Sequence, residues 1–409
     1  MRPSFIGALT GIRAIAAFWV FFRHFRPQLV DALGSGPMTQ FVIHIASVGY
    51  LGVDLFFILS GFILTYTHLD TMTSNYSWKK TIGFLWLRFA RVWPLAAFVL
   101  MLFGAYFVFQ AVSSGDPGYY SQADPFRLLM HLSLLNGWFP APLDWNGVDW
   151  SVSAEWLAYL TFSVGVVALL RYRLTASRRV MLVTIFLLML PIMIIGFSMQ
   201  DDTILLFGND SYITAAGVIP IRVLSEFWIG AIVALLARRY LVPDGARPTG
   251  LWRLPVPSIT AVSIVVAIVL VSTFDPVRNM RAGEAEFYRG IDMIAPSESI
   301  IILPLLVLLI ASLAVCPRDP LARLLSTKVF LVGGRASYAF YLVHPLLIGA
   351  GLLLLSRIGT SADGANPVVL AIVLGTAAAA WVSAWLLWRF IEEPARKVLR
   401  RMLPESVKV

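Results

Sequence analysis

Long apolar segments, each close to the length of a helix that crosses a bilayer, dominate the sequence. About 20 mostly apolar residues suffice for an α-helix to span the hydrocarbon core, and such a helix satisfies its own backbone hydrogen bonds, which lipid cannot do. The pattern therefore predicts an all-α, polytopic helical membrane protein with about ten transmembrane helices. The predicted spans are residues 6–25, 48–67, 93–112, 153–170, 180–199, 213–236, 257–273, 299–315, 329–355 and 367–390.

The overall composition agrees with a membrane protein. Hydrophobic residues make up 58% of the chain and charged residues 13%, and the mean hydropathy is +0.78. Soluble domains are less apolar and about twice as charged. The longest segments between predicted spans, 113–150 and 274–298, are predicted to be loops. We expect one membrane domain over residues 1–395, followed by a short basic cytoplasmic tail over residues 396–409.

Lysine and arginine fall mainly on one side of this topology. With the N-terminus inside, the inner segments hold twenty-one of these residues and the outer segments hold six. Cytoplasmic loops carry such a basic excess, so the N-terminus and the C-terminus are both predicted to be cytoplasmic. The net charge of +9 then belongs to the cytoplasmic membrane surface, and no nucleic-acid partner is predicted.

Residues that build disulfides or metal sites are scarce. Cys316 is the only cysteine, which excludes an internal disulfide and a cysteine-rich metal site. The sequence has no motif typical of metal ligands and no glycine-rich loop that cradles phosphate, so no metal and no bound cofactor are predicted. The first span lacks a typical cleavage signal, and we expect it to be retained.

Two polar residues in the first span form a candidate functional pair. Eleven residues separate Arg13 from His24, so on an α-helix they share one face and lie about 16 Å apart along the axis. Such groups are costly to keep in a membrane, which favours a function. The alternative is that both side chains snorkel to the surfaces or hold neighbouring helices.

The predicted topology places the other polar residues at two depths. Asp54 and Glu155 lie in the outer parts of the second and fourth spans, at a depth near that of His24. The inner arginines lie below them, so we predict a site with an anion-binding floor and an acid/base chamber above it. The ninth span carries, from the inner to the outer side, Arg335, Ser337, Tyr338, Tyr341 and His344.

Such a site suits acyl transfer from cytoplasmic acyl-CoA as a co-substrate. Charge-assisted bonds from basic side chains can hold its phosphates, and its extended pantetheine arm, on the order of 15–20 Å, matches the axial separation of the pair in the first span. The predicted donor-binding residues are Lys79, Lys80, Arg88, Arg91 and Arg335.

His24 is the predicted general base, because imidazole titrates near working pH and an attacking hydroxyl must lose its proton. Arg13 would position the donor or the base. Asp54 or Glu155 would orient the ring of His24, and spacing does not choose between them. The residues that we predict to bind the acceptor, or to have a structural role there, are Trp150, Ser151, Tyr338, Tyr341 and His344.

Five motifs, in order and spread over almost the whole chain, give the sequence a family resemblance. They are LTGIRAIAA at 9–17 with His24, GVDLFFILSGFIL at 52–64, RFARVWP at 88–94, WSVSAEW at 150–156 and SYAFYLVHP at 337–345. With these motifs the chain resembles acyltransferase family 3, the polytopic bacterial O-acyltransferases that modify surface sugars. The resemblance implies an acyl-CoA donor, an essential Arg13 and His24 pair, a donor-side motif at Arg88 and Arg91, and a functional stretch around Glu155.

Several of these residues also have structural explanations. Arg88 and Arg91 can simply set the topology. Asp54 can bond to the backbone of a broken or tightly packed helix, Glu155 can cap the start of the fourth span, and His344 can stabilise a kink at the following proline. In the sixth span, an internal ion pair is predicted between Arg222 and Glu226.

The outer loop before the fourth span is rich in aromatic and polar residues. Aromatic faces beside hydrogen-bonding groups suit a sugar ring, and the alternative is the aromatic belt found at any bilayer surface. The residues are Trp138, Phe139, Trp145 and Trp150, among Asn136, Asp144, Asn146 and Asp149.

Taken together, these patterns predict a multi-pass O-acyltransferase of the bacterial inner membrane. It would move an acyl group, most simply acetyl, from acyl-CoA to a hydroxyl of an envelope or exported polysaccharide or glycolipid. Two alternatives stay open: a transporter or flippase, because buried charges on many helices also suit translocation, and a related acyltransferase acting on a small hydroxylated metabolite. The lipid bilayer is a further predicted partner, and no oligomeric state is predicted.

Overall fold

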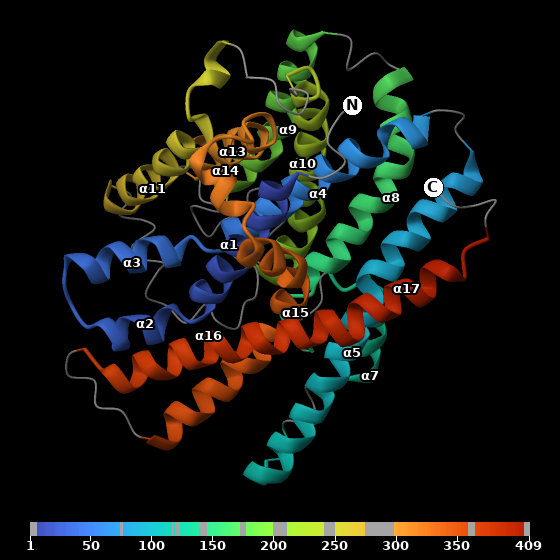
Figure 1. Ribbon diagram of the computed structural model, residues 1–409. Helices are drawn as coiled ribbons and strands as arrows, with labels where there is room; N and C mark the ends of the chain where they lie inside the picture. The colour runs from blue at the N-terminus through green and yellow to red at the C-terminus, as the bar shows by residue number, and fades with distance from the viewer. Residues whose placement is uncertain are drawn as a thin grey trace.

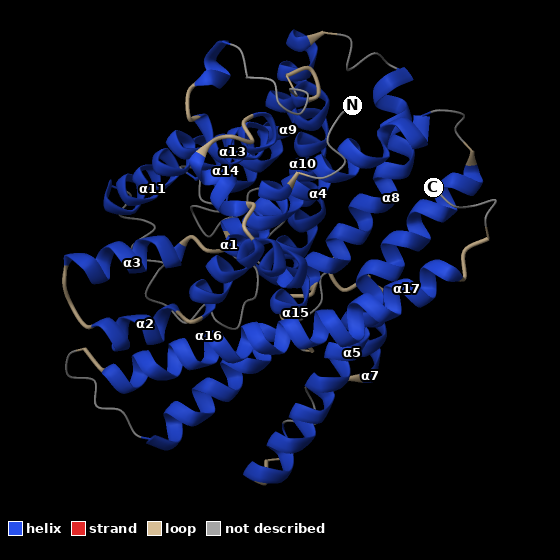
Figure 2. Ribbon diagram, viewed as in Figure 1, coloured by secondary structure: helices blue, strands red, loops and turns tan. Residues whose placement is uncertain are grey.

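In the computed structural model, the described residues lie mainly in α-helices (Figure 1). It describes residues 6–73, 77–116, 118, 123–138, 145–171, 177–198, 211–240, 250–274, 298–358 and 365–404. No strand occurs within these ranges, as Figure 2 shows, so the prediction of an all-α fold is confirmed.

Each of the ten predicted spans falls on a helix, and the chain is a multi-pass helical membrane protein. Seven of the described helices are long and apolar enough to cross a bilayer. The number ten and the cytoplasmic position of both termini stay predictions. The seven are α4 (Leu51–Thr73), α5 (Trp78–Ser114), α8 (Trp150–Arg171), α10 (Ser211–Ala237), α11 (Val256–Phe274), α15 (Lys328–Ile358) and α16 (Pro367–Leu387). The other three predicted spans correspond to α1 (Gly7–His24), α9 (Arg178–Ser198) and α13 (Leu303–Val315).

Helix α5 begins well before the predicted start of its span. It has 37 residues, and at 1.5 Å per residue it is about 55 Å long, against about 30 Å for the hydrocarbon core. Ser77 caps its first turn by accepting a hydrogen bond from the Lys79 backbone N–H. The basic residues that were predicted to precede the third span therefore lie on the same rigid helix as the span itself.

The segments between spans also form short helices that hydropathy does not reveal. Most of them begin with a proline in the first turn, where its missing N–H is not needed. They are α2 (Arg26–Leu33), α3 (Pro37–Ser47), α7 (Pro125–Leu132), the 3-10 turn η1 (Gly250–Arg253), the π-turn η3 (Glu298–Ile302) and α14 (Pro320–Leu325).

Helix α1 packs between α15 and α4 in the middle of the molecule (Figure 1). Small residues let these backbones approach closely, as is usual where helices associate in a membrane. A side-chain carbon added at Gly334 on α15 would collide with the backbone of Thr10 on α1. A carbon added at Gly52 on α4 would lie 2.6 Å from the carbonyl oxygen of Ala16. These approaches fix α1, and with it the candidate pair, against both neighbours.

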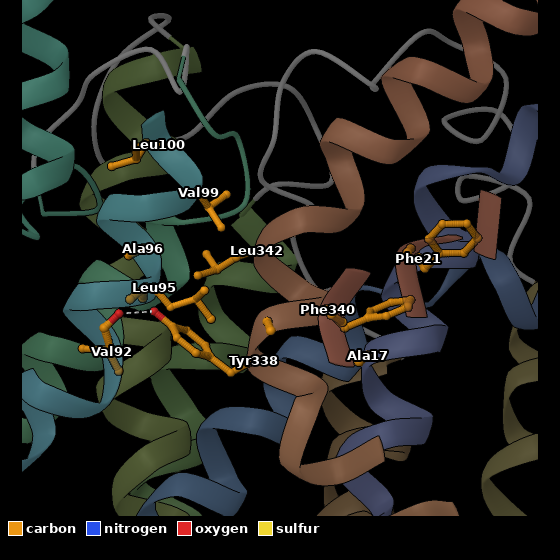
Figure 3. Close-up of a cluster of buried hydrophobic side chains, with 14 of the residues drawn as sticks. Ala17, Phe21, Val92, Leu95, Ala96, Val99, Leu100, Tyr338, Phe340 and Leu342 are labelled. Atoms are coloured by element: carbon orange, nitrogen blue, oxygen red, sulfur yellow. Dashed lines mark hydrogen bonds between the residues drawn. The ribbon is translucent and has the colours of Figure 1, made fainter. Parts of the chain in front are cut away.

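A buried core ties α1 and α15 to α5 (Figure 3). Phe21 and Phe340 are fully buried, and their ring centres lie 5.9 Å apart. The Tyr338 hydroxyl donates a 2.7 Å hydrogen bond to the carbonyl oxygen of Val92, which connects α15 directly to the basic half of α5.

Helix α16 does not end at the predicted limit of the last span. It continues through a π-turn, η4 (Trp388–Glu392), into α17 (Glu393–Arg401), seen in red across the front of Figure 1. The indole N–H of Trp86 on α5 donates a 2.8 Å hydrogen bond to the carbonyl oxygen of Leu399. The predicted boundary at residue 395 therefore falls inside a helix that packs on α5.

Candidate active site

Helix α1 carries both polar residues of the first predicted span. It is continuous from Gly7 to His24, so the eleven residues from Arg13 to His24 correspond to about 16 Å along the axis. Both side chains are partly buried. The predicted helical spacing of the pair is confirmed, and each end of the helix meets a different group of side chains.

Arg13 contacts the two helices that flank α1. Its Nε donates a 3.2 Å hydrogen bond to Ser337 Oγ on α15. Its guanidinium carbon lies 5.0 Å from the centre of the Phe56 ring on α4, within the range of a cation–π contact. The sequence did not identify a partner for Arg13. In the structure its partners are Ser337 and Phe56.

Three arginines gather around two carboxylates in what we call the arginine cluster: Arg13, Arg88, Arg91, Glu155 and Glu392. All three arginines lie within electrostatic range of Glu155. Arg91 Nη1 forms a 2.6 Å ion pair with Glu392 Oε1. The cluster is assembled from α1, α5, α8 and η4, and its guanidinium groups outnumber its carboxylates.

Arg88 is the cluster arginine that keeps an unused donor. Its Nε is buried and has no hydrogen-bond partner, and its guanidinium carbon lies 5.8 Å from the centre of the Phe84 ring. Buried polar groups are nearly always hydrogen-bonded, so such an exception needs an explanation. An anionic ligand would find a donor here.

Glu155 lies in the second turn of α8 and does not cap that helix. Ser60 Oγ on α4 donates a 2.7 Å hydrogen bond to its Oε1, and the Tyr159 hydroxyl also bonds to it. The sequence grouped Glu155 with His24 in an outer chamber. The structure places its carboxylate among the arginines instead.

His24 lies beside a second histidine at the other end of α1. The ring centres of His24 and His344 are 5.2 Å apart, and the ring planes meet at 74°. His344 is fully buried. Phe21 and Phe340 lie against the His344 ring, with centroid distances of 6.3 and 6.1 Å.

The hydrogen bond of His344 replaces the backbone bond that the following proline cannot make. Its Nδ1 lies 2.7 Å from the carbonyl oxygen of Tyr341, the oxygen that would bond to the N–H of residue 345 if that residue were not Pro345. A carbonyl only accepts, so Nδ1 carries the proton and the neutral ring has a lone pair at Nε2. That Nε2 is buried without a hydrogen-bond partner. His344 thus stabilises the helix at Pro345 and also presents an unused acceptor near His24.

Asp54 belongs to a buried ion triad between α4 and α10. Both of its carboxylate oxygens accept hydrogen bonds from Arg222 Nη2, at 2.5 and 2.7 Å. Arg222 Nε also lies 3.2 Å from Glu226 Oε1, which confirms the predicted ion pair. All three side chains are almost completely buried. The alternative interpretation, a structural Asp54 bonded to the backbone of a broken or tightly packed helix, differs from the structure in the bonding partner, which is the Arg222 side chain on α10.

Ser151 and Tyr341 join the start of α8 to α15. Their hydroxyl oxygens lie 2.9 Å apart, and both lie within 3.0 Å of the carbonyl oxygen of Val148. Trp150 is buried and packs on Phe57, with ring centres 6.3 Å apart. In this structure these candidate acceptor residues make contacts within the protein.

The remaining predicted donor residues lie apart from the cluster. Lys79 is exposed in the first turn of α5, and Lys80 Nζ donates to the carbonyl oxygen of Thr71 at 3.2 Å. Eight residues of helix, about 12 Å, separate Lys80 from Arg88. Arg335 is exposed on α15, two residues before the buried Ser337. Arg88 and Arg91 are therefore the predicted donor residues that the fold brings to Arg13.

A comparison with known protein families finds one match, described as an acyltransferase domain, over residues 6–388. The chain belongs to this acyltransferase family. The match covers all five motifs and both ends of α1, so the resemblance drawn from those motifs is confirmed.

Two curated acyltransferases align with nearly the whole chain. The acyltransferase MdmB of Streptomyces mycarofaciens is 28% identical over 408 residues, which cover 97% of this chain and 93% of that protein. The O-acetyltransferase OatA of Staphylococcus aureus is 25% identical over 413 residues, which cover 97% of this chain and 58% of OatA. No solved structure matches the chain. With its several long apolar helices, this acyltransferase is a multi-pass membrane protein.

Sequence reasoning missed a buried network in the outer loop of this acyltransferase. His131 on α7, to which no role was assigned, lies with its Nδ1 2.7 Å from Asp149 Oδ2. Asn136 Nδ2 donates a 2.6 Å hydrogen bond to Asp149 Oδ1. All three side chains are buried. Asn136 and Asp149, two of the polar residues considered for sugar binding, therefore bond to each other, and Asp149 also bonds to His131.

The tryptophans of the same loop are also engaged within the protein. The indole N–H of Trp138 donates to the Ser153 carbonyl at 2.9 Å, and that of Trp145 donates to the Asp124 carbonyl at 3.0 Å. Phe139 and Asp144 lie outside the described residues. These bonds favour a structural role for the loop, in which its aromatic residues hold the outer end of α8.

Asp149→Ala is expected to destabilise the acyltransferase. It would leave the donors of His131 and Asn136 buried without an acceptor, and each such loss costs about 1–3 kcal/mol. We expect a clearly lower melting temperature of the detergent-purified protein, followed by tryptophan fluorescence. Asp149→Asn keeps one acceptor oxygen and should lower the melting temperature less. Equal melting temperatures for wild type and Asp149→Ala would contradict a structural role of the network.

Glu392 is the other residue that the sequence gave no reason to select. Its signal in the sequence is weak: a glutamate directly after the last apolar segment, next to Glu393 and Pro394. Only the π-turn, which carries the chain on into α17, turns this side chain toward Arg91. Ser60 and Tyr159 are similar cases, because their hydroxyls acquire a role only through the position of Glu155.

Proposed function

We propose that this acyltransferase moves an acyl group, most simply acetyl, from cytoplasmic acyl-CoA to a hydroxyl of an envelope or exported polysaccharide or glycolipid, in the inner membrane of a bacterium. The observation that carries the proposal is the arrangement of α1. In the first half of this helix, Arg13 lies with Arg88 and Arg91. At its last residue, His24 lies beside His344. The axial separation of about 16 Å suits an extended pantetheine arm, on the order of 15–20 Å.

The arginine cluster is the proposed donor site. Phosphate oxygens accept strong charge-assisted hydrogen bonds, and the planar guanidinium fork matches them well. The cluster has more guanidinium groups than carboxylates, and Arg88 Nε is buried without a partner. A bound phosphate would supply the missing charge and the missing acceptor. Glu155 and Glu392 would keep the arginines in place.

The histidine pair is the proposed reaction centre. His24 takes the proton of the acceptor hydroxyl as the oxygen attacks the thioester carbonyl carbon. The tetrahedral intermediate collapses, the carbon–sulfur bond breaks, and the leaving thiolate receives the proton from His24. The products are the acyl ester and free CoA, so atoms and charge balance. His344 packs beside His24, with ring centres 5.2 Å apart.

The test is transfer of radiolabelled acetyl from acetyl-CoA into glycan by membranes that contain wild type or Arg88→Ala at matched protein levels. Losing one hydrogen bond to a charged group costs about 1.5–3 kcal/mol, so the KM for acetyl-CoA should rise about tenfold or more, with partial rescue by excess donor. Arg323→Ala, an exposed arginine on α14, serves as the control and should resemble wild type.

The outcomes separate the proposal from its alternatives. If the label appears in a small extracted metabolite and not in glycan, the protein is still an acyltransferase, but its acceptor is a small metabolite. No turnover of acetyl-CoA by wild type, with flux of a substrate across vesicles, would favour a transporter. An unchanged KM for Arg88→Ala would remove Arg88 from the donor site.

A further inference from the structure

The C-terminal part of the described chain crosses the basic half of α5. α16, η4 and α17 form one nearly continuous rod, and its η4 and α17 parts lie against α5 (Figure 1). The bond from Trp86 to the Leu399 carbonyl, at 2.8 Å, fixes the far end of α17 on α5. Trp86 lies two residues before Arg88. The last helix is therefore held against the segment that carries the proposed donor residues.

The π-turn at the joint directs one carboxylate inward. π-turns insert an extra residue into a helix and often occur at functional sites. Here the last residue of the turn, Glu392, is only 2% exposed and pairs with Arg91 at 2.6 Å. Glu393, the next residue, bonds instead to Arg396 at 2.7 Å. The two adjacent glutamates thus hold two different arginines, one on α5 and one on α17.

Arg396 lies one helical turn beyond Glu392 and extends the arginine cluster toward the cytoplasmic side. It is within electrostatic range of both Arg88 and Glu392. Its side chain is 41% exposed, so water and a soluble ligand can reach it. Arg88, in contrast, has its Nε buried and without a partner. One arginine that is open to solvent and one that is sheltered therefore lie on facing helices.

This arrangement has an electrostatic consequence. Arg91 pairs with Glu392 and Arg396 pairs with Glu393 at close range, whereas Arg88 has no carboxylate ion pair among the described residues. Arg88 has both of these arginines nearby and shares the carboxylate of Glu155 with Arg13 and Arg91. Like charges that are partly removed from water repel one another, and a buried charge without a counterion is strongly unfavourable. An anion between the two helices would offset both costs.

We propose that α17 forms one wall of the donor site and that Arg396, together with Arg88, binds the phosphate groups of the acyl donor's polyanionic head. The inference rests on the proposed function, since it takes the arginine cluster as the donor site. Phosphate groups of anionic lipids have the same chemistry. We commit to the acyl donor because the Arg88 donor is sheltered inside the helix bundle, where the head of a bilayer lipid does not reach.

The experiment measures binding of CoA to the full chain in nanodiscs of phosphatidylcholine, by isothermal titration calorimetry. Wild type is compared with Arg396→Ala, with Arg396→Lys and with Arg401→Ala, an exposed arginine on the same helix. We expect Arg396→Ala to weaken binding about tenfold or more, Arg396→Lys to recover part of the loss, and Arg401→Ala to match wild type. Melting temperatures show that the variants are folded.

Each outcome bears on the proposal differently. Equal CoA affinity for wild type and Arg396→Ala would overturn the role of Arg396 while the donor site around Arg88 still stands. A difference that appears only after phosphatidylglycerol is added to the nanodiscs would overturn it in favour of a lipid headgroup. If wild type binds no CoA, the donor assignment under the proposed function is itself wrong, and this inference is wrong with it.

Discussion

His24→Ala is expected to lower kcat for acyl transfer by about 10²- to 10⁴-fold, the usual contribution of a general base. The loss should persist at every donor concentration, because His24 lies at the opposite end of α1 from the arginine cluster and does not hold the donor's head. The measurement is the steady-state rate of transfer of labelled acetyl over a range of acetyl-CoA concentrations, at matched protein levels. The KM for acetyl-CoA should change little.

The control for His24→Ala is His44→Ala, which also removes a histidine but from α3, away from the motifs. It should transfer acetyl at the wild-type rate. Because His24 packs on His344, a merely structural role would show as a lower melting temperature of His24→Ala with a parallel loss of activity. Wild-type kcat for His24→Ala would contradict the assignment of the base.

Arg222→Ala is expected to have the largest effect on stability. The substitution leaves the carboxylates of Asp54 and Glu226, both fully buried, close together without a cation. Breaking a buried ion pair from one side costs about 3–5 kcal/mol, a large part of the stability of a typical domain. We expect little folded protein after extraction into detergent and a strongly lowered melting temperature in any fraction recovered.

Asp54→Asn distinguishes the two explanations of Asp54. This variant keeps Arg222 paired with Glu226, so it should fold. If Asp54 acts only through the triad, the folded variant should retain most of its kcat. A folded Asp54→Asn protein with a large loss of kcat would instead support the predicted catalytic carboxylate. Recovery of wild-type stability in Arg222→Ala would contradict the ion triad.

The comparison of sequence and structure is most informative at particular residues. Hydropathy located ten helices, because a bilayer demands a long apolar segment wherever the chain crosses it. The motifs identified the family, and helical spacing fixed Arg13 and His24 on one helix. Hydropathy did not locate the start of α5, because Lys79, Lys80, Arg88 and Arg91 interrupt the apolar residues of its first turns.

The pairing of polar groups across helices was the part that spacing could not supply. Asp54 was one of two carboxylates considered as the partner of His24, and its oxygens bond to Arg222, 168 residues away. Glu155 was grouped by depth with His24, and it bonds to Ser60 on another helix. The predicted topology gives only the depth of a side chain in the membrane, whereas a hydrogen bond also depends on the rotation and lateral position of its helix.

The sequence by itself determined the membrane class, the helical fold, the family and the helix that carries both predicted functions. Those properties follow from composition, from the periodicity of one segment at a time and from short motifs. Only the tertiary structure decided which carboxylate meets which arginine, that His344 lies beside His24, and that the last helix packs against the basic half of α5. Each of these depends on how helices distant in the sequence rotate and approach one another, and that is set by the packing of the whole molecule.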